Sequence, residues 1–178
     1  MFDLIAGLPV HPLIVHATEV IVPSAALAVI LAALWPRFRQ WAYGLPLLLA
    51  LGGLVLTPMT TQSGEALERH VESSDLLAKH TSIAEGLLPF VVVLAVAAGG
   101  LFWWARQERI NARVAAAPGP KIAPTGLKAL PRNLFLGLAA VALLAGIGTV
   151  VQAVRIGHSG AEAAWSDVVT PAPAPSDG

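Results

Sequence analysis

Histidines are the residues of this chain best suited to hold a metal ion or a cofactor. The 178-residue sequence contains no Cys, which removes thiolate ligands, cysteine nucleophiles and disulfides together. Neutral imidazole binds haem iron and ions such as Zn, Fe, Mn and Cu. The chemistry open to the chain therefore depends on the positions of its histidines, which are His11, His16, His70, His80 and His158.

Acidic residues and one arginine near these histidines could complete a site. Glu19 follows His16 by three positions, so the two side chains share a helix face. Arg155, His158 and Glu162 share a face in the same way if one helix contains them. A carboxylate beside an imidazole fixes its tautomer and raises its basicity, whereas Arg155 needs an anion such as a carboxylate or a haem propionate. The candidate supporting carboxylates are Glu19, Glu65, Glu85 and Glu162.

The composition indicates that membrane-spanning elements position these residues. Hydrophobic residues make up 56% of the chain and charged residues only 12%, about half the usual share of a soluble domain. Eleven basic and eleven acidic residues cancel, so no net charge draws the chain to nucleic acid. The length allows one small domain, and the lipid bilayer is its expected partner.

Four apolar runs are long enough to cross the hydrocarbon layer of a bilayer. They cover residues 12–34, 42–61, 76–104 and 134–154, with a cytoplasmic loop over 105–132. We therefore expect an all-α protein, a four-helix transmembrane bundle, in a single domain of residues 1–169. The Pro- and Ala-rich tail, residues 170–178, is expected to be disordered.

The charges of the connections predict the orientation of the bundle. The connections after the first and third runs are basic, with Glu108 as their single acid. The connection after the second run is mainly acidic. By the positive-inside rule the basic connections lie in the cytoplasm, so both termini are extracytoplasmic. The tryptophans at the cytoplasmic ends agree with this topology, because Trp is enriched at membrane interfaces.

This topology places all five histidines at the extracytoplasmic side. Counted at about 1.5 Å per residue, His16 lies about 28 Å above Trp35, and His80 about 36 Å above Trp104. With hydrocarbon about 30 Å thick, these groups lie near the outer boundary, as do His158, Glu65 and Glu85. We predict a shared site formed by the histidines of different helices, His16, His80 and His158. His11 is either a helix cap or a further ligand, and His70 is expected to be solvated.

Several strings together resemble the domain-of-unknown-function 2231 family of four-span bacterial membrane proteins. They are GLPVHPLIVH, TQSGEALE, KHTSIAEG and VRIGHSGAEAAW, and they cover the chain from Gly7 to Trp165. The Gly-Glu pair after the second run is similar to the actinobacterial-type branch. The resemblance implies a bacterial plasma membrane location and recurrent histidines at His11, His16, His80 and His158. In place of the common Phe-Pro after the first motif, this chain has Ala17-Thr18-Glu19.

Three functions are compatible with these residues. The first is electron transfer by one haem b held by two histidines, since the architecture resembles small b-type membrane cytochromes. The second is a transition-metal site of imidazoles and carboxylates, which the number of nearby acids favours. The third is a non-catalytic accessory subunit of a larger membrane complex, respiratory complexes included, or a homo-oligomer. The sequence leaves open whether the protein is an enzyme and names no catalytic residue.

Two other classes fit the sequence poorly. A channel or transporter usually carries charged residues in the middle of its spans, and these spans have none there. Hydrolysis by a serine nucleophile is also disfavoured, because Ser159 and His158 are adjacent and do not face each other on a helix.

Overall fold

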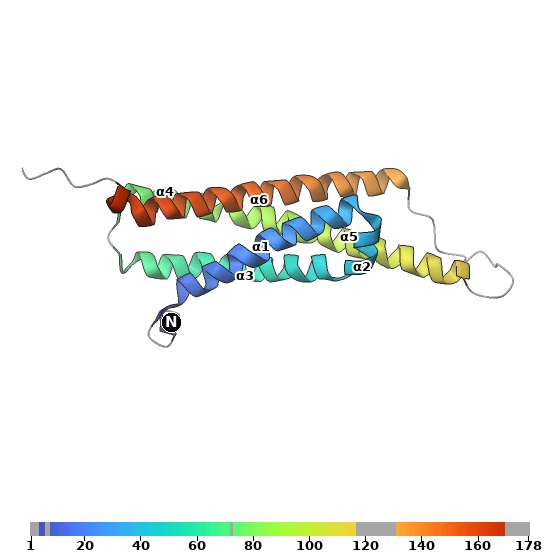
Figure 1. Cartoon of the computed structure of the whole chain (residues 1–178), viewed down its shortest axis with the longest axis horizontal. Helices are drawn as coiled ribbons and strands as arrows, with labels where there is room; N and C mark the ends of the chain where they lie inside the picture. The colour runs from blue at the N-terminus through green and yellow to red at the C-terminus, as the bar shows by residue number, and fades with distance from the viewer. Residues whose placement is uncertain (1–3, 6–7, 72, 117–130, 170–178) are drawn as a thin grey trace, which may run out of the picture.

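Helices form almost all of the described chain (Figure 1). The structure is a computed structural model that describes residues 4–5, 8–71, 73–116 and 131–169. Two-residue strands, β1 (Leu4–Ile5) and β2 (Leu8–Pro9), pair antiparallel ahead of the first helix. The helices are α1 (Val10–Leu34), α2 (Pro36–Ala42), α3 (Leu45–Glu68), α4 (Asp75–Glu85), α5 (Leu87–Ala116) and α6 (Arg132–Val169).

Four helical segments are long and apolar enough to cross a membrane, which confirms the expected all-α fold with four spans. The third segment is interrupted at Gly86, so the expected helix is divided into α4 and α5. The connection expected at 105–132 is helical as far as Ala116. Residues 117–130 of that connection, and the tail of residues 170–178, lie outside the described residues.

Small residues form the centre of the bundle. α1, α3, α5 and α6 pack in a ring in which each helix contacts two neighbours, and α1 also contacts α5 across the centre. The core between them is rich in alanine, and the large side chains Leu94 and Leu101 are fully buried within it. Small side chains let transmembrane helices approach closely, which replaces the hydrophobic effect as the source of association within lipid. Large apolar side chains such as Leu144 instead point outward.

The two halves of the chain repeat each other in sequence. Residues 10–42, which form α1 and α2, resemble residues 79–111 at a constant offset of 69 positions. Residues 45–68 of α3 resemble residues 141–164 of α6 at an offset of 96 positions. Identical pairs at the first offset are His11/His80, Ile14/Ile83, Val22/Val91, Ala26/Ala95, Ala28/Ala97, Trp35/Trp104 and Arg37/Arg106. At the second offset they include Gly52/Gly148, Val55/Val151, Ser63/Ser159 and Gly64/Gly160.

The burial pattern repeats at the same offsets. Buried positions of α1 that recur as buried positions of α5 are Thr18/Leu87, Val22/Val91, Ala25/Leu94, Ala26/Ala95, Ala28/Ala97, Val29/Ala98 and Ala32/Leu101. Between α3 and α6 they are Pro46/Ala142, Ala50/Gly146, Gly53/Thr149 and Ser63/Ser159. α1 and α5 run in one direction and α3 and α6 in the other (Figure 1). The bundle is therefore a parallel repeat of two helical hairpins, related by an approximate two-fold axis along the bundle.

Equivalent residues of the two halves meet along this axis. Val22 and Val91 belong to one buried cluster and both lie against Gly53. At one end Arg39 contacts Glu108, which occupies the equivalent position in the second half. We name this end the arginine end. The opposite end carries His11 and His80, and we name it the histidine end.

Candidate functional site

His11 is held by a serine of the neighbouring helix. It lies in the first turn of α1, where its imidazole is half-buried. Its Nδ1 lies 2.9 Å from Oγ of Ser63, which is on α3 and only 5% exposed. The side chain therefore joins α1 to α3. This contact lies outside α1, so the structure does not support the interpretation of His11 as a helix cap.

His80 makes the same contact in the second half. Its Nδ1 lies 3.0 Å from Oγ of Ser159, which is on α6 and 3% exposed. The residue before it, Lys79, forms an ion pair of 3.1 Å with Glu162, which also joins α4 to α6. A histidine from one helix and a serine from its hairpin partner thus form one unit in each half.

The serine hydroxyls determine which imidazole nitrogen carries the proton. Ser63 donates its hydroxyl hydrogen to the carbonyl of Thr60 at 2.9 Å, and Ser159 donates to Ile156 at 3.0 Å. A serine hydroxyl has one hydrogen, so in this arrangement each Oγ accepts from Nδ1 of its histidine. In the tautomer that fits this arrangement, Nδ1 carries the proton and Nε2 keeps the lone pair that a metal-binding imidazole requires.

A glycine follows each serine because the imidazole lies against the helix backbone. A Cβ added at Gly64 would lie 3.1 Å from Cε1 of His11. The same atom added at Gly160 would lie 3.1 Å from Cε1 of His80. Both distances are shorter than an ordinary van der Waals contact, so a larger residue would displace the ring. The Ser-Gly pairs therefore fix both the position and the tautomer of the two histidines.

The two histidines occupy equivalent positions around the approximate two-fold axis. Farther along the axis, Val22, Leu87 and Val91 form a buried apolar cluster. The histidine end thus combines two equivalent imidazoles from different halves with an apolar region toward the centre of the bundle.

The other predicted site residues lie on the surface of the described chain. His16, His70 and His158 are exposed, and His158 pairs with Glu162 at 3.1 Å. α6 does continue through Gly157, as the shared face of Arg155, His158 and Glu162 required. The remaining predicted residues Glu19, Glu65, Glu85 and Arg155 are exposed. Among the described residues, no group of three or more His, Cys, Asp or Glu side chains is placed to hold a metal ion.

Sequence reasoning missed both serines and the polar cluster of the arginine end. The serines were identifiable from the repeat, since a Ser-Gly pair occurs in both TQSGEALE and VRIGHSGAEAAW. At the arginine end, Arg39 is 4% exposed and donates to both carboxylate oxygens of Glu108, at 3.2 and 2.8 Å. It also donates to the carbonyl of Ala32 at 2.8 Å, and its guanidinium lies over the ring of Phe135.

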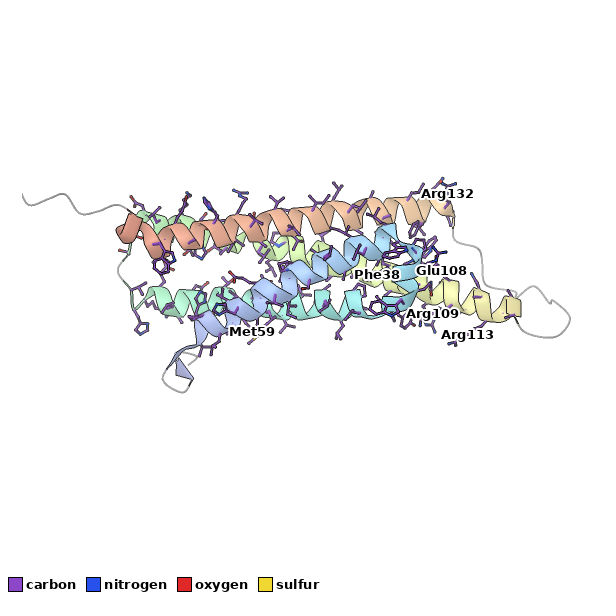
Figure 2. All side chains as sticks on the ribbon, viewed as in Figure 1. Phe38, Met59, Glu108, Arg109, Arg113 and Arg132 are labelled. Atoms are coloured by element: carbon purple, nitrogen blue, oxygen red, sulfur yellow. The ribbon has the colours of Figure 1, made fainter. Side chains whose placement is uncertain are left out.

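The surroundings of Glu108 complete this cluster, part of which Figure 2 shows. Trp104 donates to Glu108 at 3.0 Å, and Gln40 donates to the same carboxylate. Arg109 donates to both the side chain and the backbone carbonyl of Gln40. Gln40 and Arg109 are again equivalent positions of the two halves. Because all of its members bind one another, the cluster is a structural joint between the halves.

The fold and these contacts define a class, a helical membrane protein with four candidate spans in two similar halves. Its sequence matches the family model of the domain-of-unknown-function 2231 family, described as a predicted membrane protein, over residues 7–173. The chain belongs to this family. Its assignment to an actinobacterial-type branch stays a prediction. No curated protein and no solved structure matches the chain.

Proposed function

We propose that the protein is a b-type haem protein that transfers electrons, with His11 and His80 as the two axial ligands. The observation that carries this proposal is the matched pair of imidazoles, each held at Nδ1 by a serine. This arrangement provides one imidazole from each half, at equivalent positions. A haem b would be held by these two residues, His11 and His80.

The donor set favours haem over a bare metal ion. A porphyrin supplies four nitrogens to iron, so two imidazoles complete its coordination. A Zn site normally needs three or four protein ligands, and no group of three donors is present in the described part of the chain. We therefore narrow the predicted ligand set of His11, His16, His80 and His158 to the two histidines that are each held by a buried serine, His11 and His80.

The chain's own residues would orient and shelter the group. Ser63 and Ser159 would hold each imidazole in the ligating tautomer, and the apolar cluster around Val22 and Val91 lies farther into the bundle. When bound, a haem with two histidine ligands supplies a one-electron couple with no open position for a substrate. Arg155, exposed near the same end, remains our proposed partner for a propionate. These features favour electron transfer over catalysis.

The distribution of charge supports an extracytoplasmic position for the histidine end in a bacterial plasma membrane. Arg37, Arg106, Arg113 and Arg132 are exposed on the segments that approach the arginine end. By the positive-inside rule this end faces the cytoplasm. The proposed haem would then lie near the extracytoplasmic surface, where it can exchange electrons with a partner outside the cell membrane.

The test is an optical spectrum of the protein purified in detergent from cells supplied with a haem precursor. We expect a Soret band, with split α and β bands on reduction. His11→Ala and His80→Ala should each remove the six-coordinate spectrum. His16→Ala and His158→Ala are matched controls from the same end of the bundle, and they should retain it. Loss of the spectrum in the controls alone would support the exposed histidines as ligands instead.

Metal analysis by mass spectrometry on the same samples separates the other functions. A stoichiometric Zn, Mn, Cu or non-haem Fe content without a Soret band would contradict the haem proposal and favour a metal site. Absence of both the Soret band and a bound metal, also after reconstitution with haem and with each metal, would contradict the proposal. The remaining interpretation would then be a non-catalytic accessory subunit.

A further inference from the structure

One face of α1 carries two polar residues that point away from the bundle. His16 and Glu19 are both exposed, and neither is among the residues that form hydrogen bonds or ion pairs within the described chain. On a helical wheel His16 lies within about 20° of Leu27, and Glu19 lies about 60° to one side of His16. Leu27 is 57% exposed, and Val20 beside it is 64% exposed. This face is therefore an apolar surface with one base and one acid at the level of its second and third turns.

The depth of Glu19 makes a lipid-facing position costly. It precedes Trp35 by sixteen residues, about 24 Å of helix, whereas the hydrocarbon layer is about 30 Å thick. A carboxylate within hydrocarbon requires a partner, because an ionisable group there has lost its hydration. Some other molecule must therefore cover this face.

We propose that a second copy of this chain covers it, in a two-fold dimer whose axis is perpendicular to the membrane. His16 and Glu19 lie on either side of a line along the helix that passes between them. In a parallel two-fold dimer, the left side of that line on one copy faces the right side on the other. His16 of each copy then meets Glu19 of the other, so the patch is complementary to itself.

The rest of the face fits this occupant. Below the polar pair, Leu27 and Leu34 lie within about 20° of the His16 direction and are exposed. Leu34, about 30° from that line, would lie near the axis, and Leu27, about 50° from it, would lie beside the axis, which gives an apolar contact toward the arginine end. Burial of two charge pairs between apolar side chains gives such an interface its specificity. Two copies of the proposed site would then face the same side of the membrane.

Charge exchange tests the interface. The mass of the full-length protein is measured in detergent and in lipid nanodiscs, with dilution to obtain the dimer dissociation constant. We expect a dimer for the wild type. His16→Glu and Glu19→His should each weaken it by about tenfold or more, because like groups then meet. The double variant His16→Glu/Glu19→His should restore the dimer. The same exchange at His158 and Glu162, another exposed pair, is the control that should leave it intact.

Cross-linking provides a second measurement, because the natural chain has no Cys. A single Leu27→Cys should form a disulfide-linked dimer in membranes, whereas Leu144→Cys, an even more exposed position on α6, should not. A monomer in both detergent and nanodiscs would overturn the proposal. A dimer that resists both single exchanges would place the interface elsewhere. Stoichiometric disulfide cross-linking of the Leu27→Cys variant to a different protein would show that this protein, and not a second copy, covers the face.

Discussion

The serine hydroxyl decides which nitrogen of each candidate ligand is free. Ser63 and Ser159 each donate to a carbonyl of their own helix, so each can only accept from its histidine. A histidine released from this contact could take the other tautomer and turn its lone pair away from the partner half. The residues next to the candidate ligands should therefore matter nearly as much as the ligands themselves.

Removal of one hydroxyl should weaken haem binding without abolishing it. We expect Ser63→Ala and Ser159→Ala each to lower haem affinity by about tenfold, the usual effect of losing a group that orients a ligand. Titration of the apoprotein with haem, followed at the Soret band, measures the change. Ser24→Ala, at an exposed position of α1, should have no effect. Equal affinities for all three variants would show that the serines do not orient the ligands.

The sequence predicts a histidine site at one end of the bundle, but it could not show which histidines lie inward. Spacing along a helix shows which side chains share a face, and it does not show which face points inward. The depth of His16 and the presence of Glu19 on its face favour His16 as a ligand, yet that face is exposed. His11, considered as a cap, points to Ser63 through a contact between residues 52 positions apart.

Glycine determines how closely the helices pack. Seven glycines of the spans behave in two ways. Those at positions 52, 53, 100, 146 and 148 have neighbouring side chains where a Cβ would lie, whereas Gly99 and Gly137 have nothing within 4 Å. At Gly146 the added atom would lie 2.6 Å from Ile30 and 3.3 Å from the carbonyl oxygen of Ala26. Contact between α1 and α6 therefore depends on the absence of this side chain.

Two alanine substitutions on α6 should separate these classes. We expect Gly146→Ala to lower the free energy of unfolding by about 1–3 kcal/mol, the usual effect of overpacking. Gly137→Ala should leave it within about 0.5 kcal/mol, since it meets no neighbour. Unfolding in mixed detergent micelles, followed by circular dichroism, measures both variants. A similar loss for the two would show that the contact of Gly146 with α1 does not control the result, because Ala is the better helix former at both positions.

Apolar runs sufficed to predict the four spans, because the bilayer requires about 20 apolar residues of each. They could not predict the break between α4 and α5. Gly86 lies in an otherwise helical pattern, and a single glycine is a weak signal. The break is supported by tertiary contact, since Gln152 of α6 donates to the freed carbonyl of Ile83 at 2.6 Å. That contact joins residues 69 positions apart, which local patterns do not detect.

At the scale of the whole molecule, the Arg39–Glu108 pair joins the two halves on their approximate symmetry axis. The repeat that defines this axis is visible in the sequence, because His, Trp and Arg occur at positions 11, 35 and 37 and again, with the same spacing, at positions 80, 104 and 106. It is hidden by unequal connections and by helix breaks at different places, Trp35 in one half and Gly86 in the other.

Because the two positions are equivalent, the charges of this joint should be exchangeable. Glu108→Arg should lower the free energy of unfolding by about 2 kcal/mol, since it leaves the buried Arg39 facing a like charge. The double variant Arg39→Glu/Glu108→Arg should recover at least half of that loss. Thermal unfolding in detergent measures both. No recovery would show that the pair depends on its surroundings and not on the equivalence of the halves.

The equivalent positions 39 and 108 carry residues of opposite charge, and this difference also affects how the chain assembles during synthesis. The first hairpin enters the membrane before the second exists, among identical hairpins of neighbouring nascent chains. Two first hairpins in the native arrangement would bring Arg39 against Arg39, and two second hairpins would bring Glu108 against Glu108. Only a first hairpin paired with a second hairpin brings Arg39 against Glu108. The pair thus acts as a check against misassembly and domain swapping, a hazard to which repeated proteins are especially exposed.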